Sequence, residues 1–222
     1  MRSFSAFNRL LWIFFFFIGL LIAVRIFYSG NIRYIFLSWN IFLAWIPYVL
    51  SNYFSIYKGR ESWKQGILFV SWLLFFPNAL YIVTDLVHLE QSPEVPIWYD
   101  AVLLFASSFV GLIMAFVSLQ RVEYYLHGIF NKKTVKFIIP LLLFTGSFGV
   151  YLGRFQRWNS WDVIHNPFLL GTDILKQFIS PVENYKTWVI TIIFSAFYSL
   201  IYFFIKIIPQ ALRENVSKQN VS

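Results

Sequence analysis

Residues 66–84 read GILFVSWLLFFPNALYIVT, a run of 19 residues without a charged side chain. A helix needs about 20 apolar residues to cross the hydrocarbon core of a bilayer. Five further stretches share this character, and Arg25 is the only charge among them; it lies near the end of its span, where a long side chain can reach the headgroups. The predicted spans are residues 10–28, 34–57, 66–84, 101–119, 137–153 and 187–205. The sequence therefore predicts an all-α, polytopic integral membrane protein with six transmembrane helices in a single domain over residues 1–222.

The composition of the chain excludes most other classes. Of the 222 residues, 59% are hydrophobic and 13% are charged, and the mean hydropathy is +0.64. A soluble domain carries about 25% charged residues, so this chain would lack the polar surface to stay in water. Because the chain has no cysteine, thiolate catalysis and cysteine-bound metals are excluded. The net charge of +8 fits basic cytoplasmic loops, and no nucleic acid is expected as a partner.

The distribution of Lys and Arg predicts the orientation of the spans. Cytoplasmic loops carry the excess of these residues, and the alternating loops hold 12 of them on the side of the N-terminus and six on the other side. The 12 are Arg2, Arg9, Lys58, Arg60, Lys64, Arg121, Lys132, Lys133, Lys136, Lys206, Arg213 and Lys218. Both termini should therefore face the cytoplasm.

The last outer loop, residues 154–186, is long enough to hold structure of its own. Asn166 and Pro167 are typical of an N-cap and a first helical residue. Phe168, Leu175, Phe178 and Ile179 then fall on one face. This pattern predicts a short helix that lies in the outer interface.

Four polar residues form a stripe along the third span and just beyond its end. Asn78, Tyr81, Asp85 and His88 stand at offsets 0, 3, 7 and 10, which in an α-helix places them within an arc of roughly 80°. Pro77 beside them favours a kink. The stripe ends in a carboxylate and an imidazole at the outer surface.

Asn40 of the second span lies at the depth of Asn78, as counted from the outer ends of the two spans. An unpaired amide in hydrocarbon is costly, so the two side chains either bond each other or form the floor of a pocket. Both interpretations stay open at this stage.

Other span ends bring further charges to the outer face. Asp100 opens the fourth span, and Arg154, Arg157 and Asp162 follow the fifth. An Asp in a first turn also complements the helix dipole, and acid–arginine pairs also tie helix ends together. We predict one outward-facing pocket with catalytic Asp85, His88, Asp100 and Asp162, and with substrate-binding Arg154, Arg157, Asn78, Tyr81 and Asn40.

Neither a metal nor a cofactor is expected. The spacing of Asp85 and His88 recurs in Asp162 and His165, and carboxylate with imidazole suits zinc or iron. Such a spacing of common residues often arises by chance, however, and the sequence has no nucleotide-binding fingerprint.

Small residues recur every fourth position in the fourth span, as Ser107, Gly111 and Ala115. This spacing lets helix backbones approach closely. We expect these residues to pack against another helix, with the fifth span as the partner.

Several segments together resemble the uncharacterised bacterial membrane family catalogued as domain of unknown function 1361. The segments are residues 39–47 (WNIFLAWIP), 74–79 (LFFPNA), Tyr81, 84–89 (TDLVHL), 98–100 (WYD) and 153–162 (GRFQRWNSWD). The chain departs from the family pattern at Leu80, where the pattern has a second proline, and His165 lies outside it. The resemblance implies a small multi-pass protein of the bacterial plasma membrane and supplies no activity.

Three functions fit these residues, and whether the protein is an enzyme stays open. A membrane enzyme would hold an anionic envelope or lipid-linked substrate with Arg154 and Arg157 and use Asp85 and His88 for acid–base work. A non-enzymatic assembly protein would bind another membrane protein and use the charges as structural ties. A small proton-coupled transporter would use the polar stripe as its pathway, although no inverted repeat is visible.

Overall fold

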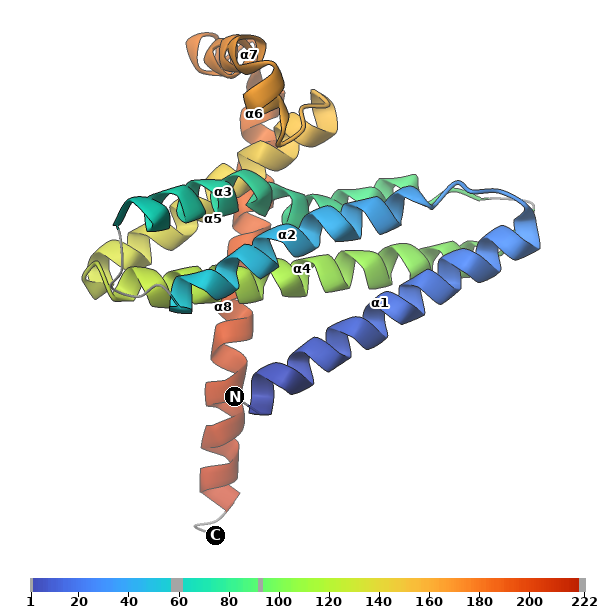
Figure 1. The fold of residues 1–222 in the computed structure, drawn as a ribbon, viewed down its shortest axis with the longest axis horizontal. Helices are drawn as coiled ribbons and strands as arrows, with labels where there is room; N and C mark the ends of the chain where they lie inside the picture. Colours follow the sequence, from blue (N-terminus) through green and yellow to red (C-terminus); the bar gives the residue numbers. More distant parts are fainter. Residues whose placement is uncertain (1, 57–61, 92–93, 220–222) are drawn as a thin grey trace. The chain divides into compact units, whose positions relative to one another are not determined.

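The computed structural model describes residues 2–56, 62–91 and 94–219. The chain divides into two compact units, Met1–Ile129 and Phe130–Ser222. The first contains α1 (Arg2–Ser29), α2 (Phe36–Ile56), α3 (Ser62–Tyr81), the 3₁₀ helix η1 (Ile82–His88) and α4 (Ile97–His127); the second contains α5 (Lys132–Phe155), α6 (Asp162–His165), α7 (Pro167–Ile179) and α8 (Tyr185–Gln219) (Figure 1). Every regular element in these described ranges is a helix, which confirms the all-α prediction. A single domain over residues 1–222 stays a prediction.

Five helices among the described residues are long and apolar enough to cross a membrane. They are Ala6–Ser29, Trp63–His88, Ile97–His127, Lys132–Phe155 and Tyr185–Pro209. They correspond to five of the six predicted spans and make the chain a multi-pass membrane protein. The remaining predicted span, residues 34–57, is occupied by α2, a helix of 21 residues. The helix α2 contains Asn40, Ser51 and Asn52 but no charged residue, and the sixth crossing stays a prediction.

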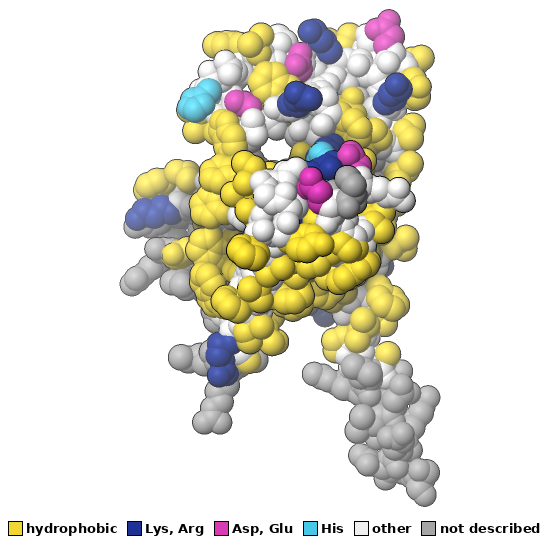
Figure 2. Space-filling view, turned by 90° about the vertical axis from the view of Figure 1, so that its right-hand side faces the viewer, with side chains coloured by type: hydrophobic (Ala, Val, Ile, Leu, Met, Phe, Trp, Pro, Cys, Tyr) yellow, Lys and Arg dark blue, Asp and Glu magenta, His cyan; other side chains and the backbone are white. Residues whose placement is uncertain are grey.

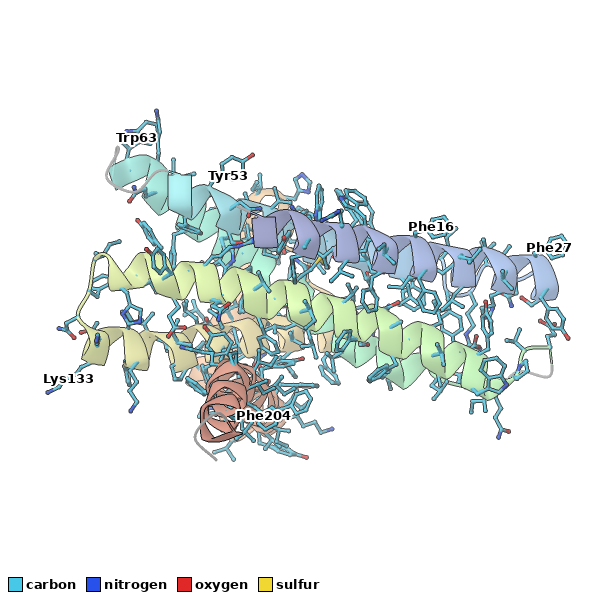
Figure 3. All side chains as sticks on the ribbon, turned by 90° about the horizontal axis from the view of Figure 1, so that it is seen from below. Phe16, Phe27, Tyr53, Trp63, Lys133 and Phe204 are labelled. Carbon is cyan, nitrogen blue, oxygen red and sulfur yellow. The ribbon has the colours of Figure 1, made fainter. Side chains whose placement is uncertain are left out.

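The helix α4 is the centre of the first unit. In the most apolar 18-residue segment of α4, 67% of the segment is buried. The helices α1, α2 and α3 all pack against α4. The N-terminal helix α1 contributes a narrow stripe of buried side chains, Leu11, Ile18 and Ile22, at the spacing of one helix face. Phe16 and Phe27 project from α1 away from the other helices of this unit (Figure 3). The exposed face of α1 is therefore suited to lipid.

The helix α4 is longer than predicted, because it continues past the charges that bound its apolar run. Both charges are bonded inside the unit. Asp100 accepts from Arg25, and Arg121 donates to the carbonyl oxygen of Tyr48 at 3.1 Å and to the hydroxyl of Ser51 at 3.0 Å. A charge that is paired within the protein does not need to end a buried helix.

The predicted third span changes its helix type. The α-helix ends at Tyr81, and η1 continues as a 3₁₀ helix. The hydroxyl of Ser108 donates to the carbonyl oxygen of Ile82 at 3.1 Å, at the start of the 3₁₀ turn. A Cβ on Gly111 would lie 2.5 Å from Cγ2 of Ile82. Gly111 thus packs closely against another element as expected, and that element is η1; packing of these small residues against the fifth span stays a prediction.

In the second unit, α5 and α8 lie side by side. Asn131 caps α5 by accepting from the backbone N–H of Thr134 at 2.9 Å. The helix α7 begins at Pro167, within the loop where the sequence predicts a short helix. It packs through Phe178 against Trp188, with ring centroids 4.9 Å apart. Its position in a membrane interface stays a prediction.

Candidate functional site

Polar side chains gather at the end of the first unit where α1 ends, α2 begins, η1 closes α3 and α4 begins. We call this the Asp85 end and define it by Arg25, Tyr34, Asn40, Asp85, His88 and Asp100. Viewed onto this end, acidic, basic and histidine side chains lie together above a band of hydrophobic ones (Figure 2). Four of the predicted site residues are therefore brought to one end of the unit: Asn40, Asp85, His88 and Asp100.

Asp85 is buried, with 1% of its surface exposed, and accepts a hydrogen bond of 2.7 Å from Nδ2 of Asn40. The bond joins η1 to α2. A 3₁₀ helix has three residues per turn, so Ile82, Asp85 and His88 share one line along η1. The α-helical arc calculated for the stripe is therefore wrong beyond Tyr81, but the 3₁₀ period still places Asp85 and His88 on one face.

Asp100 and Arg25 form a buried ion pair. Nε of Arg25 donates to Oδ1 at 2.7 Å and Nη2 donates to Oδ2 at 3.1 Å, with 3% and 1% of the two side chains exposed. The guanidinium carbon also lies 4.5 Å from the ring centroid of Tyr34. Arg25 therefore does not reach out to the headgroups, as its place near a span end suggested. Instead it neutralises Asp100 and ties α1 to α4.

Tyr34 connects this pair to η1. Its hydroxyl donates to the backbone carbonyl of His88 at 2.8 Å, and the His88 ring packs edge-on against Phe36, with centroids 5.2 Å apart. At the surface, Arg33 and Glu90 pair at 2.5 Å, and the Arg33 guanidinium holds the pKa of Glu90 below its ordinary value. This ion pair thus joins the segment that follows η1 to the loop between α1 and α2.

Asn78 and Tyr81 lie on α3 before the change of helix type, and both are partly buried. Nδ2 of Asn78 donates to the carbonyl oxygen of Phe75 at 3.1 Å. The carbonyl oxygen of Tyr81 accepts from the hydroxyl of Thr84 at 2.6 Å. Nδ2 of Asn40 bonds Asp85, so this amide has an acceptor that neither sequence-based interpretation named.

The other predicted site residues belong to the second unit. Arg154 lies in the last turn of α5, and Arg157 follows with a φ of 61°, a left-handed conformation that is uncommon outside glycine. Oδ2 of Asp162 accepts from the backbone N–H of Asn159 at 2.7 Å, which closes the turn before α6. His165 is exposed. A single pocket that joins these residues to the Asp85 end stays a prediction.

Within residues 2–56, 62–91 and 94–219, no group of three or more His, Asp or Glu side chains is placed to hold a metal ion. Asp85 and His88 share a face, but the described residues supply no third ligand beside them.

Arg25 and Tyr34 are the site residues that sequence reasoning missed. Arg25 is the single charge within residues 10–28, and a charge inside an apolar span usually has a partner. That signal could have indicated an ion pair, although the sequence analysis placed Arg25 at the headgroups. The partner lies 75 residues away, and its identity follows from the packing of α1 on α4.

The fold and the site define an all-helical, multi-pass membrane protein with a buried polar cluster at one end of its first unit. The chain belongs to the family described as Protein of unknown function (DUF1361), whose model matches residues 39–201. This match confirms the resemblance found in the sequence. It begins just before Asn40 and includes Asp85 and Asp100, whereas Arg25 and Tyr34 precede it. No curated protein and no solved structure matches the chain.

Proposed function

We propose that this protein is a six-span protein of the bacterial plasma membrane with both termini in the cytoplasm. In this arrangement the Asp85 end faces outward and α7 lies in the outer interface. The site acts on an anionic substrate of the envelope, such as a lipid-linked phosphate. The supporting observation is the buried Asp85 carboxylate, which is held by the neutral amide of Asn40 on the same face of η1 as His88.

The two buried acids of this end have different surroundings. Both oxygens of Asp100 accept from the guanidinium of Arg25, so Asp100 is the partner of a structural ion pair. Asp85 accepts from the side-chain amide of Asn40 and lies on the same face of η1 as His88. A general acid or base must take up and release a proton during each turnover. Asp85 is therefore the proposed proton-transfer group, and Asp100 positions the end of α4.

The remaining roles follow from location and charge. His88 lies one 3₁₀ turn beyond Asp85 and is partly exposed, so it is the proposed second proton-transfer group, nearer the surface. Arg154 and Arg157 are the proposed ligands of the anionic group, because guanidinium groups bind phosphate and carboxylate bidentately. Asp162 is assigned to the turn before α6, since its carboxylate bonds the backbone there.

The experiment compares Asp85→Asn, His88→Ala and Glu90→Gln in a strain that lacks the gene. Glu90 is the matched control, because it is an acid near the same end with 63% of its side chain exposed. The first two variants should fail to restore the wild-type phenotype while folded protein, measured by size-exclusion chromatography and thermal melting, stays at the wild-type level. Glu90→Gln should restore the phenotype. Full restoration by Asp85→Asn, or failure of this variant only through unfolding, contradicts the proposed site.

A non-enzymatic assembly protein is the second candidate. The observation in its favour is the buried Arg25–Asp100 pair, in which one of the predicted catalytic acids bonds α4 to α1. On this hypothesis Asp85 and Asn40 form another tie of the same kind. Folded Asp85→Asn protein would then restore the phenotype fully.

A further inference from the structure

A cavity of about 310 Å³ lies between α2 and α3, at the end of the first unit opposite the Asp85 end. It is lined by Leu50, Tyr53, Trp63, Lys64, Gln65, Ile67, Leu68 and Ser71. Sites for small ligands have volumes of about 300–1,000 Å³ and are mostly apolar with a few polar groups. None of the lining residues belongs to the proposed site around Asp85.

The cavity is elongated along α3. Its lining extends from Trp63 to Ser71, which corresponds to about 12 Å of α-helix. Leu50 and Tyr53 of the antiparallel helix α2 form the facing wall. Trp63 and Ile67 are 63% and 59% exposed, so this wall lies on the side surface of the unit. In a multi-pass membrane protein, such a surface borders lipid.

The polar groups of the cavity are unevenly distributed. Lys64 and Gln65 lie at the end near the start of α3, and the hydroxyl of Tyr125 bonds the side-chain carbonyl of Gln65. Nζ of Lys64 lies 5.4 Å from the ring centroid of Trp63. A cation beside an aromatic ring is typical of the membrane–water interface. The remaining length of the cavity is mostly apolar: it is bordered by Leu50, Tyr53, Ile67 and Leu68, with the hydroxyl-bearing Ser71 at its far end.

We infer that this cavity binds an anionic phospholipid, with an acyl chain between α2 and α3 and the phosphate at Lys64. The apolar length matches a chain in shape and polarity, and the cation at its interfacial end complements the phosphate. The excess of Lys and Arg predicts that this end faces the cytoplasm, and that leaflet carries anionic lipids which attract basic residues near the surface. The inference is independent of the reaction proposed for Asp85.

The test uses the full chain, purified in detergent, with dioleoylphosphatidylglycerol and dioleoylphosphatidylcholine as added lipids. Native mass spectrometry measures the apparent affinity for each lipid. Wild-type protein should bind the anionic lipid more tightly. Lys64→Gln should weaken that binding about fivefold and leave phosphatidylcholine binding unchanged. Lys133→Gln is the matched control, because Lys133 is an exposed lysine near the start of α5, and it should bind both lipids as the wild type does.

A second variant tests the position of the acyl chain. Ile67→Trp enlarges an exposed wall residue, so the fold should tolerate it, and it should weaken the binding of both lipids by narrowing the cavity. Unchanged binding by Ile67→Trp overturns the inference. It is also overturned if Lys64→Gln and Lys133→Gln lose equal affinity, or if inorganic phosphate alone competes fully, since the site would then bind a free anion.

Discussion

Ile82 lies against Gly111, at the point where α3 gives way to the 3₁₀ helix η1. A Cβ on Gly111 would lie 2.5 Å from Cγ2 of Ile82 and 3.3 Å from the carbonyl oxygen of Ala79. Three residues earlier on α4, Ser108 donates to the carbonyl oxygen of Ile82. The close contact of η1 with Ser108 and Gly111 of α4 therefore determines where η1 begins, and so where Asp85 lies.

We expect Gly111→Ala to destabilise the protein, and Gly111→Leu to do so more strongly. Ile82 is β-branched and fully buried, so it has little freedom to move away from an added methyl group. Overpacking of this kind costs about 1–3 kcal/mol. Thermal melting in detergent measures the loss.

The matched control is Gly19→Ala in α1, because a Cβ there would meet no heavy atom within 4 Å. Replacing a helical glycine by alanine without a clash stabilises by about 0.5–1 kcal/mol. If both alanine variants melt at or above the wild-type temperature, the close approach of Ile82 does not constrain the fold.

The Arg25–Asp100 pair should behave as a coupled unit. Arg25→Met or Asp100→Leu alone leaves a buried charge without its partner, and such a loss costs about 3–5 kcal/mol. The double variant Arg25→Met, Asp100→Leu removes both charges and should recover most of that stability. A double-mutant cycle from melting data measures the coupling. Additive losses would show that the two side chains do not depend on each other.

The sequence predicted those features of the fold that depend on local composition. Apolar runs located the helices, and the helix start at Pro167 was visible in the dipeptide Asn166-Pro167. The fourth span was predicted shorter than α4 at both ends. Asp100 and Arg121 look like the boundaries of the helix until their bonds to Arg25 and Tyr48 are known. A charged residue marks the end of an apolar run in the sequence. The helix itself can continue past that residue when the charge has a partner within the protein.

The candidate site shows the same division. The recurrence of polar residues along the third span identified Asp85 and His88, because both lie on one face in either helix type. The partners of the acids depend on tertiary packing. Asn40 was expected at the depth of Asn78, but its amide bonds Asp85, 45 residues away. Spacing within one helix carries no information about such a choice.

The left-handed conformation of Arg157 predicts an unusual order of stability, in which a glycine variant is more stable than an alanine variant. For a residue with a side chain this conformation costs about 1–2 kcal/mol, and glycine adopts it freely. Arg157→Gly should therefore be more stable than Arg157→Ala by about 1 kcal/mol in the free energy of unfolding, and it should melt at the higher temperature. If the guanidinium binds the anionic substrate, both variants should lose the phenotype although Arg157→Gly is the more stable. Equal melting of the two would show that residue 157 is not strained.

We expect α2 to cross the membrane, which makes the number of spans six. Its 21 residues extend about 32 Å, enough for the hydrocarbon core. Three of its polar side chains are bonded within the protein: Ser51 and Asn52 donate to the carbonyl oxygen of Tyr48 at 2.7 and 3.3 Å, and Asn40 donates to Asp85. Polar groups that are satisfied in this way do not prevent a helix from crossing.

The natural chain has no cysteine, so single-cysteine variants can be labelled without background. Asn31→Cys lies between α1 and α2, and Lys58→Cys lies between α2 and α3, outside the described residues. A membrane-impermeant maleimide should label residue 31 on intact cells and residue 58 only after permeabilisation, with unlabelled wild-type protein as the control. Glu183→Cys, before α8, should behave like residue 31. If residues 31 and 58 are labelled from the same side, α2 is an internal helix, and the predicted orientation of one terminus is wrong.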